Sequence, residues 1–109
     1  MPRDEVEAAY FALLRARDEL AALRRFQEYL ADERRRIQRF VREGEALADQ
    51  VDPRLRRRLR HTDDPLAEAF RTRLAVIADE EARMPDRIAA AEAFVDESER
   101  DHAALRRSR

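Results

Sequence analysis

The chain has 109 residues, with 23 basic side chains against 24 acidic ones, so it is one small domain without the net positive charge of histone-like nucleic-acid binders. It contains no cysteine, which excludes disulfides, thiolate zinc sites and cysteine nucleophiles. One glycine and four prolines leave few loop signals, and the abundant Ala, Leu, Arg and Glu favour helix, so we expect an all-α fold.

The N-terminal stretch MPRDEVEAAYF has acids where the apolar part of a signal peptide would begin. No apolar run approaches the length of a membrane span. We therefore expect a cytoplasmic protein without a membrane partner.

The first predicted helix covers residues 4–50, because apolar residues recur there at alternating spacings of three and four. We call the stripe that they form the seam of this helix. Its members are Val6, Ala9, Leu13, Ala16, Leu20, Leu23, Gln27, Leu30, Arg34, Ile37, Val41, Gly44, Ala48 and Val51.

A short elbow helix is predicted over residues 53–60, because Asp52 is a suitable N-cap and Pro53 suits the first helical position. The pair Asp64-Pro65 repeats this start signal. We therefore expect residues 61–64 to be a linker before the next helix.

The second long helix is predicted over residues 65–107, with a kink near Pro85 rather than a break, because the apolar spacing keeps its phase through the proline. Its seam consists of Phe70, Leu74, Ile77, Glu81, Met84, Ile88, Ala91, Val95, Ser98, His102 and Leu105.

Two long helices joined by a short elbow predict a coiled-coil-like antiparallel hairpin, and the charges indicate its register. If residue x lies opposite roughly 115 minus x, Arg34–Arg36 face Asp79–Glu81. The same register places Arg106, Arg107 and Arg109 beside the acids of residues 4–7. Arg34 and Glu81 interrupt the two seams at the same level, and such a polar pair commonly fixes the register.

A two-helix hairpin buries little of its apolar surface, and this chain carries large apolar side chains outside the seams. We therefore expect either a homodimer, a four-helix bundle in which these side chains meet, or a stable contact with another helical protein. The candidate dimer face consists of Tyr10, Phe11, Leu14, Phe26, Tyr29, Phe40 and Phe94.

The elbow sequence PRLRRRLRH, residues 53–61, concentrates arginines and is a candidate site for an acidic protein or nucleic acid. The candidate residues are Arg54, Arg56, Arg57, Arg58 and Arg60. Alternatively, these arginines pair locally with Asp49, Asp52, Asp63 and Asp64. No aromatic residue lies in residues 52–64 to stack on bases, which disfavours binding of single-stranded nucleic acid.

Glu99 and His102 have the three-residue spacing used in carboxylate-bridged di-iron bundles. The stretch Glu99-Arg-Asp-His102-Ala-Ala-Leu105 resembles the encapsulated ferritins, and this resemblance implies a metal-binding helical dimer. The likeness covers only this stretch, and the first helix offers only Asp18 and Glu19 nearby, beside the seam rather than on it.

The sequence has no glycine-rich phosphate loop, no serine in a nucleophile turn and no evident pocket for paired carboxylates. We therefore expect no enzymatic activity and no cofactor. The sequence favours a helical interaction or scaffolding module that self-associates and presents a basic elbow to an acidic partner. A nucleic-acid-associated protein and a ferritin-like metal-binding dimer remain as alternatives.

Overall fold

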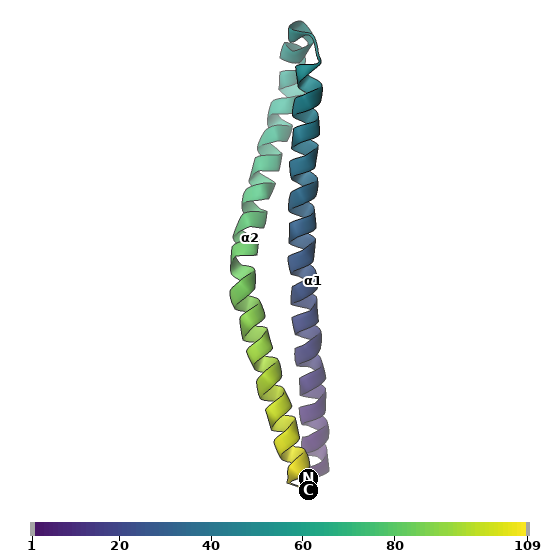
Figure 1. The fold of residues 1–109 in the computed structure, drawn as a ribbon, viewed down its shortest axis with the longest axis vertical. Coiled ribbons are helices and arrows are strands. Elements are labelled where there is room, and N and C mark those ends of the chain that lie inside the picture. Colours follow the sequence, from purple (N-terminus) through teal and green to yellow (C-terminus); the bar gives the residue numbers. More distant parts are fainter. Residues whose placement is uncertain (1, 109) are drawn as a thin grey trace. The chain divides into compact units, whose positions relative to one another are not determined.

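The computed structural model describes residues 2–108, and side chains for residues 4–108 (Figure 1). Helix α1 spans Pro2–Asp49 and helix α2 spans Pro53–Arg107, and no strand occurs among the described residues. The first turn of α1 carries Asp4 and Glu5, and the last turn of α2 carries Arg106 and Arg107, which is the charge distribution that the helix dipole favours. The prediction of an all-α helical hairpin is confirmed.

The turn between the helices comprises residues 50–52 and contains no glycine. The turn is hydrogen-bonded to the last turn of α1, because the backbone N–H of Gln50 donates to the carbonyl oxygen of Leu47 at 3.1 Å. Asp52 is the N-cap of α2, because its Oδ1 accepts a hydrogen bond from the backbone N–H of Arg54 at 2.8 Å. The predicted start of a helix at Asp52-Pro53 is therefore present.

The predicted linker at residues 61–64 is wrong, because α2 is helical throughout this stretch and through Pro65. A proline inside a helix removes one backbone hydrogen bond but does not by itself end the helix. Residues 61–64 contain no glycine or proline that would end the helix earlier. The elbow is accordingly the first turns of α2 rather than a separate helix. The helix also continues through Pro85, as the preference for a kink over a break predicted.

The chain divides into two compact units, and the first combines Met1–Glu28 with Arg83–Arg109. In it, part of α1 lies beside an oppositely directed part of α2 (Figure 1). Leu13, Ala16, Leu20 and Val95 form a buried cluster, with Ile88 and Ala91 packed against it. All of these are predicted seam residues, so the seam is the core of this unit.

The second unit is Tyr29–Ala82 and contains the turn between the helices. Leu30 and Ile37 on α1 and Ile77 on α2 are buried there, and Ile77 is fully buried. Val41, Ala48, Phe70 and Leu74 are half-buried seam residues, while Gly44 is exposed. In this unit too, the seams of α1 and α2 supply the buried side chains.

No helix among the described residues is long and apolar enough to cross a membrane.

Candidate interaction surfaces

On one side of the first unit, two ion pairs join α1 and α2. Arg17 Nη2 lies 3.2 Å from Glu99 Oε1, and Arg24 Nη2 lies 3.3 Å from Glu92 Oε1. Each of these four residues directly follows a seam residue. On the side of the helix pair that follows the seams, α1 and α2 are therefore joined by two ion pairs.

A second apolar stripe lies one position before the seams. The spacing of the α2 seam can be continued from Phe70 towards the start of the helix, which gives positions 67, 63, 60 and 56. With these positions included, the large apolar side chains that are exposed in the described part of the chain directly precede a seam position, except for Tyr10 and Phe11. We call these residues the second stripe. They are Phe26, Tyr29, Phe40 and Leu47 on α1, and Leu55, Leu59, Leu66, Val76 and Phe94 on α2.

The geometry of an antiparallel helix pair places both halves of this stripe on one side within each unit. Successive residues of a helix are rotated by about 100° around its axis, so the residue before a seam position and the residue after it point to opposite sides. Because the two helices run in opposite directions and face each other, "before the seam" is the same side for both. In the first unit this side is opposite the Arg17–Glu99 and Arg24–Glu92 ion pairs.

The second stripe is most continuous on α2 in the second unit. Leu55, Leu59, Leu66 and Val76 are exposed there by 48%, 40%, 48% and 45%, and Thr62 and Ala69 fill the intermediate stripe positions. On α1 of the same unit, Glu33, Arg36 and Glu43 interrupt the stripe between its apolar members Tyr29, Phe40 and Leu47. The α2 part is thus the better surface for packing a further helix.

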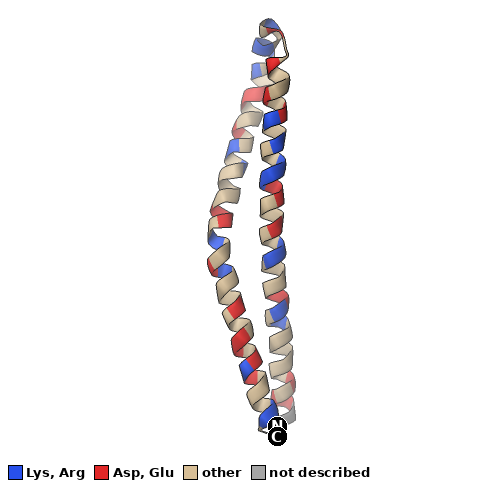
Figure 2. Ribbon diagram, viewed as in Figure 1, with Lys and Arg blue, Asp and Glu red and all other residues tan. Residues whose placement is uncertain are grey.

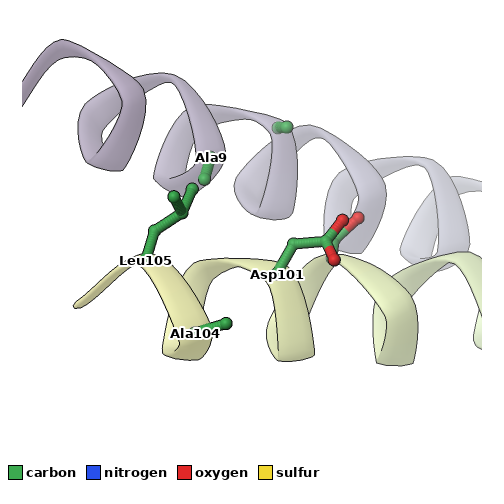
Figure 3. Close-up of a pocket in the computed structure, with 6 residues that line it drawn as sticks. Ala9, Asp101, Ala104 and Leu105 are labelled. Atoms are coloured by element: carbon green, nitrogen blue, oxygen red, sulfur yellow. The ribbon is translucent and has the colours of Figure 1, made fainter. Parts of the chain in front are cut away.

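In the first unit the same side carries a hollow lined by small side chains. It is formed by Ala9, Ala12, Ser98, Asp101, Ala104 and Leu105. Figure 3 shows the side chain of Leu105 pointing towards Ala9 and the Asp101 carboxylate turned towards α1. Alanines at such positions permit the close approach of another helix.

The structure divides the predicted dimer face into two groups. Phe26, Tyr29, Phe40 and Phe94 belong to the second stripe, whereas Tyr10, Phe11 and Leu14 follow the seam residues Ala9 and Leu13 and do not.

Tyr10 packs against the rings of Phe11 and His102, with ring centroids 5.9 and 5.6 Å apart. Tyr10, Phe11 and His102 line a separate hollow together with Val6, Glu7 and Arg106. Glu7 and Arg106 thus lie close together, in agreement with the predicted register, whereas Arg109 lies outside the described residues.

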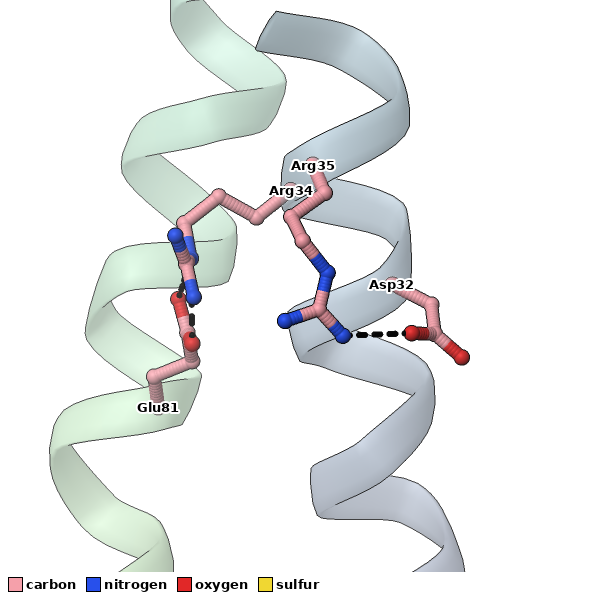
Figure 4. A network of polar contacts seen from close by, with 4 residues as sticks. All are labelled: Asp32, Arg34, Arg35 and Glu81. Carbon is pink, nitrogen blue, oxygen red and sulfur yellow. Dashed lines mark hydrogen bonds and ion pairs between the residues drawn. The ribbon is translucent and has the colours of Figure 1, made fainter.

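The predicted contact between Arg34 and Glu81 is present in the second unit. Figure 4 shows the Arg34 guanidinium reaching from α1 to the Glu81 carboxylate on α2. Arg35 and Arg36, which were predicted to face the acids of α2, form ion pairs on their own helix, Arg35 with Asp32 at 2.6 Å and Arg36 with Glu33 at 3.5 Å. Pairs at this spacing form readily on one helix, since residues three apart are neighbours on its surface.

The five elbow arginines have different environments. Arg56 is half-buried, its Nη2 donates a hydrogen bond to the Val51 carbonyl oxygen at 3.3 Å, and its buried Nε has no partner within the described structure. This arginine therefore binds the turn between α1 and α2.

The other four, Arg54, Arg57, Arg58 and Arg60, are exposed. Figure 2 shows basic residues gathered at the start of α2. Among the described residues their guanidinium groups form no ion pair or hydrogen bond, so the predicted local pairing with Asp49, Asp52, Asp63 and Asp64 is not seen. The first turn of α2 also contains no acidic residue. The positive charges of these side chains thus add to the partial positive charge at the N-terminal end of α2.

The candidate metal ligands Glu99 and His102 take part in separate contacts. Glu99 pairs with Arg17, and the His102 ring packs against the Tyr10 ring at a tilt of 43°. No group of three or more His, Cys, Asp or Glu side chains that could hold a metal ion occurs in the described part of the chain. The arrangement therefore offers no third ligand to this pair.

Comparisons with protein-family models, with curated proteins and with solved structures gave no match to this chain.

The sequence prediction omitted the α2 members of the second stripe in the second unit from its candidate dimer face. Leu55 and Leu59 were absent because residues 53–60 were assigned to a separate helix. Leu66 and Val76 lie in the predicted second long helix, and the available signal for Val76 was its place directly before the seam residue Ile77.

Proposed function

We propose that this protein is a non-enzymatic helical interaction module that self-associates through the second stripe. The observation that supports the proposal is the position of the exposed large apolar residues, which, apart from Tyr10 and Phe11, directly precede seam positions. Scattered apolar residues on a surface need no explanation, but large apolar residues that recur at one side of the seam are typical of a surface that another helix covers.

The small core supports the same proposal. The buried apolar residues within the described structure are Leu13, Ala16, Leu20, Leu30, Ile37, Ile77, Met84 and Val95. A single row of such contacts between two helices buries a small share of the apolar surface, and small domains of this kind usually gain stability by association. A second copy packed on the second stripe would complete a four-helix bundle.

The proposal is tested by substituting the stripe on both helices. The variant Phe40→Gln, Leu47→Gln, Leu66→Gln is compared with the wild type and with the control variant Tyr10→Gln, Phe11→Gln by size-exclusion chromatography with light scattering. We expect dimers for the wild type and for the control, and monomers for the stripe variant with helix content retained by circular dichroism. A monomeric wild type, or dissociation by the control alone, would overturn the proposal.

The unpaired arginines at the start of α2 favour an additional role in binding an anionic partner. Arg54, Arg57 and Arg60 are exposed, and their guanidinium groups have no partner within the described structure. Clustered guanidinium groups bind phosphates and carboxylates. Binding to nucleic acid weakens steeply as the salt concentration rises, because the release of condensed counterions into the solution then gains less free energy.

The probes for this role are a labelled DNA duplex and a polyglutamate peptide, measured by fluorescence anisotropy at 50 and 200 mM salt. The variant Arg54→Gln, Arg57→Gln, Arg60→Gln should lose binding to one of the two probes, and this probe identifies the class of partner. Equal binding by the wild type and the variant to both probes, or none by either, would refute the role of the elbow.

A further inference from the structure

We propose that the second copy binds along α2, antiparallel to it, with the two helices crossing at Leu66. This inference rests on the proposed self-association and specifies its surface and direction. It uses only α2 residues of the second unit, so the whole contact lies on one compact part of the chain.

The apolar pattern of this part of α2 is nearly the same when it is followed in either direction. Leu66 is at the centre of the row Leu55, Leu59, Thr62, Leu66, Ala69, Arg73 and Val76. In an antiparallel pairing centred on Leu66, this residue meets its own copy, and Leu55 meets Val76 at both ends. Thr62 meets Ala69, which are both small, so the backbones can approach closely. A surface that pairs with itself by a two-fold axis must be complementary to itself in this way.

Leu59 meets Arg73 in this pairing, which is the one unlike pair in the row. The long apolar stem of an arginine can cover a leucine while its guanidinium group stays in water. Arg73 is exposed, so its charge need not be buried by the contact.

The charges at the two ends of the row distinguish antiparallel from parallel pairing. The N-terminal end carries the exposed Arg58, whereas the C-terminal end carries Asp79. These two residues border the same edge of the row, and neither forms an ion pair within the described structure. Antiparallel pairing brings Arg58 of one copy towards Asp79 of the second copy, and the two-fold axis repeats this attraction. Parallel pairing would bring arginine to arginine, and like charges at an interface are unfavourable.

The α1 part of the second stripe is the less suitable contact in this unit. Glu33, Arg36 and Glu43 lie between its apolar residues. Covering them with a helix would bury charges, and Arg36 already pairs with Glu33. We therefore assign the central contact to α2 and place the α1 stripe at its margin.

The test uses the absence of native cysteine, which makes every crosslink specific for an introduced residue. Single variants Leu66→Cys, Leu55→Cys, Val76→Cys and the control Ala78→Cys are oxidised under identical conditions. Ala78 is exposed and directly follows the seam residue Ile77, so it lies on the opposite side of α2 from the stripe. We expect a disulfide-linked dimer from Leu66→Cys alone and from a mixture of Leu55→Cys with Val76→Cys. Neither of the latter two, nor Ala78→Cys, should crosslink alone.

A second measurement tests the charges without a crosslink. The single variants Arg58→Glu and Asp79→Arg should each raise the dissociation constant of the dimer by about threefold to tenfold, and the double variant should restore it. Leu66→Glu should raise it by at least about tenfold, because a carboxylate at the centre of the contact has no partner.

The failures of the two proposals are distinguishable. If the wild type is a monomer in light scattering, self-association itself is refuted. If the wild type is a dimer but Leu55→Cys crosslinks alone, the pairing is parallel and the inference is wrong. If it is a dimer and none of the stripe cysteines crosslinks, α2 is not the contact, and the inference is equally wrong while self-association stands.

Discussion

Arg34 on α1 holds both carboxylate oxygens of Glu81 on α2 with a single Nε, at 3.1 and 3.2 Å. The two side chains are 37% and 28% exposed, so the pair is partly withdrawn from water within the row of seam residues. A pair in such a position costs desolvation and fixes which residues of the two helices lie opposite each other.

Breaking this pair on one side should cost more than replacing both partners. We expect Arg34→Met to lower the free energy of unfolding by about 1 kcal/mol, because Glu81 then remains without its partner in the seam. The double variant Arg34→Leu, Glu81→Leu should be as stable as the wild type or more stable, because leucines fill the seam. Urea denaturation followed by circular dichroism measures all three proteins. A double variant less stable than Arg34→Met would contradict the account of this pair.

Ile77 is fully buried in the second unit, and its truncation should leave a cavity. We expect Ile77→Ala to lower the free energy of unfolding by about 2 to 4 kcal/mol. The control is Thr72→Ala, since Thr72 is exposed on the same helix and should change stability by less than about 0.5 kcal/mol. Equal effects of the two substitutions in urea denaturation would show that the seam is not the core.

Gly44 lies within α1, and a Cβ atom added there would meet no atom within 4 Å. Glycine inside a helix is less favourable than alanine by about 1 kcal/mol, chiefly because the unfolded chain is more flexible. We therefore expect Gly44→Ala to raise the free energy of unfolding by up to about 1 kcal/mol, measured by thermal and urea unfolding. A loss of stability would mean that the seam needs the glycine for a closer helix approach than the structure shows.

Arg54 is in the first turn of α2, where its positive charge opposes the helix dipole. The variant Arg54→Glu should be more stable by about 0.5 kcal/mol at low salt, and the gain should shrink as salt screens the charges. Arg60→Glu is the control, since Arg60 lies beyond the first turn and should change stability less. Thermal unfolding at two salt concentrations measures both. If Arg54→Glu proves less stable at low salt, Arg54 has an interaction that the structure does not contain.

The sequence predicted the seams well because burial between two helices imposes a regular spacing on apolar residues. Each predicted seam residue of α2 is buried or half-buried, and on α1 only Gln27 and Gly44 are exposed. The Arg34–Glu81 contact was predictable for the same reason, since both residues interrupt an otherwise apolar row.

Two features were not predictable from local signals. Asp64-Pro65 has the composition of a helix start, but nothing before it ends the helix that Asp52 already caps, so α2 continues. Arg35 and Arg36 have acids both across the hairpin and on their own helix, and the sequence does not decide between them.

Sedimentation equilibrium of the unmodified chain over a range of concentrations tests the central claim of self-association most directly. The chain has a mass of 12.9 kDa, and we predict that the measured mass rises with concentration towards twice this value. A mass that stays at 12.9 kDa up to the highest concentration, with helix content retained, would contradict it.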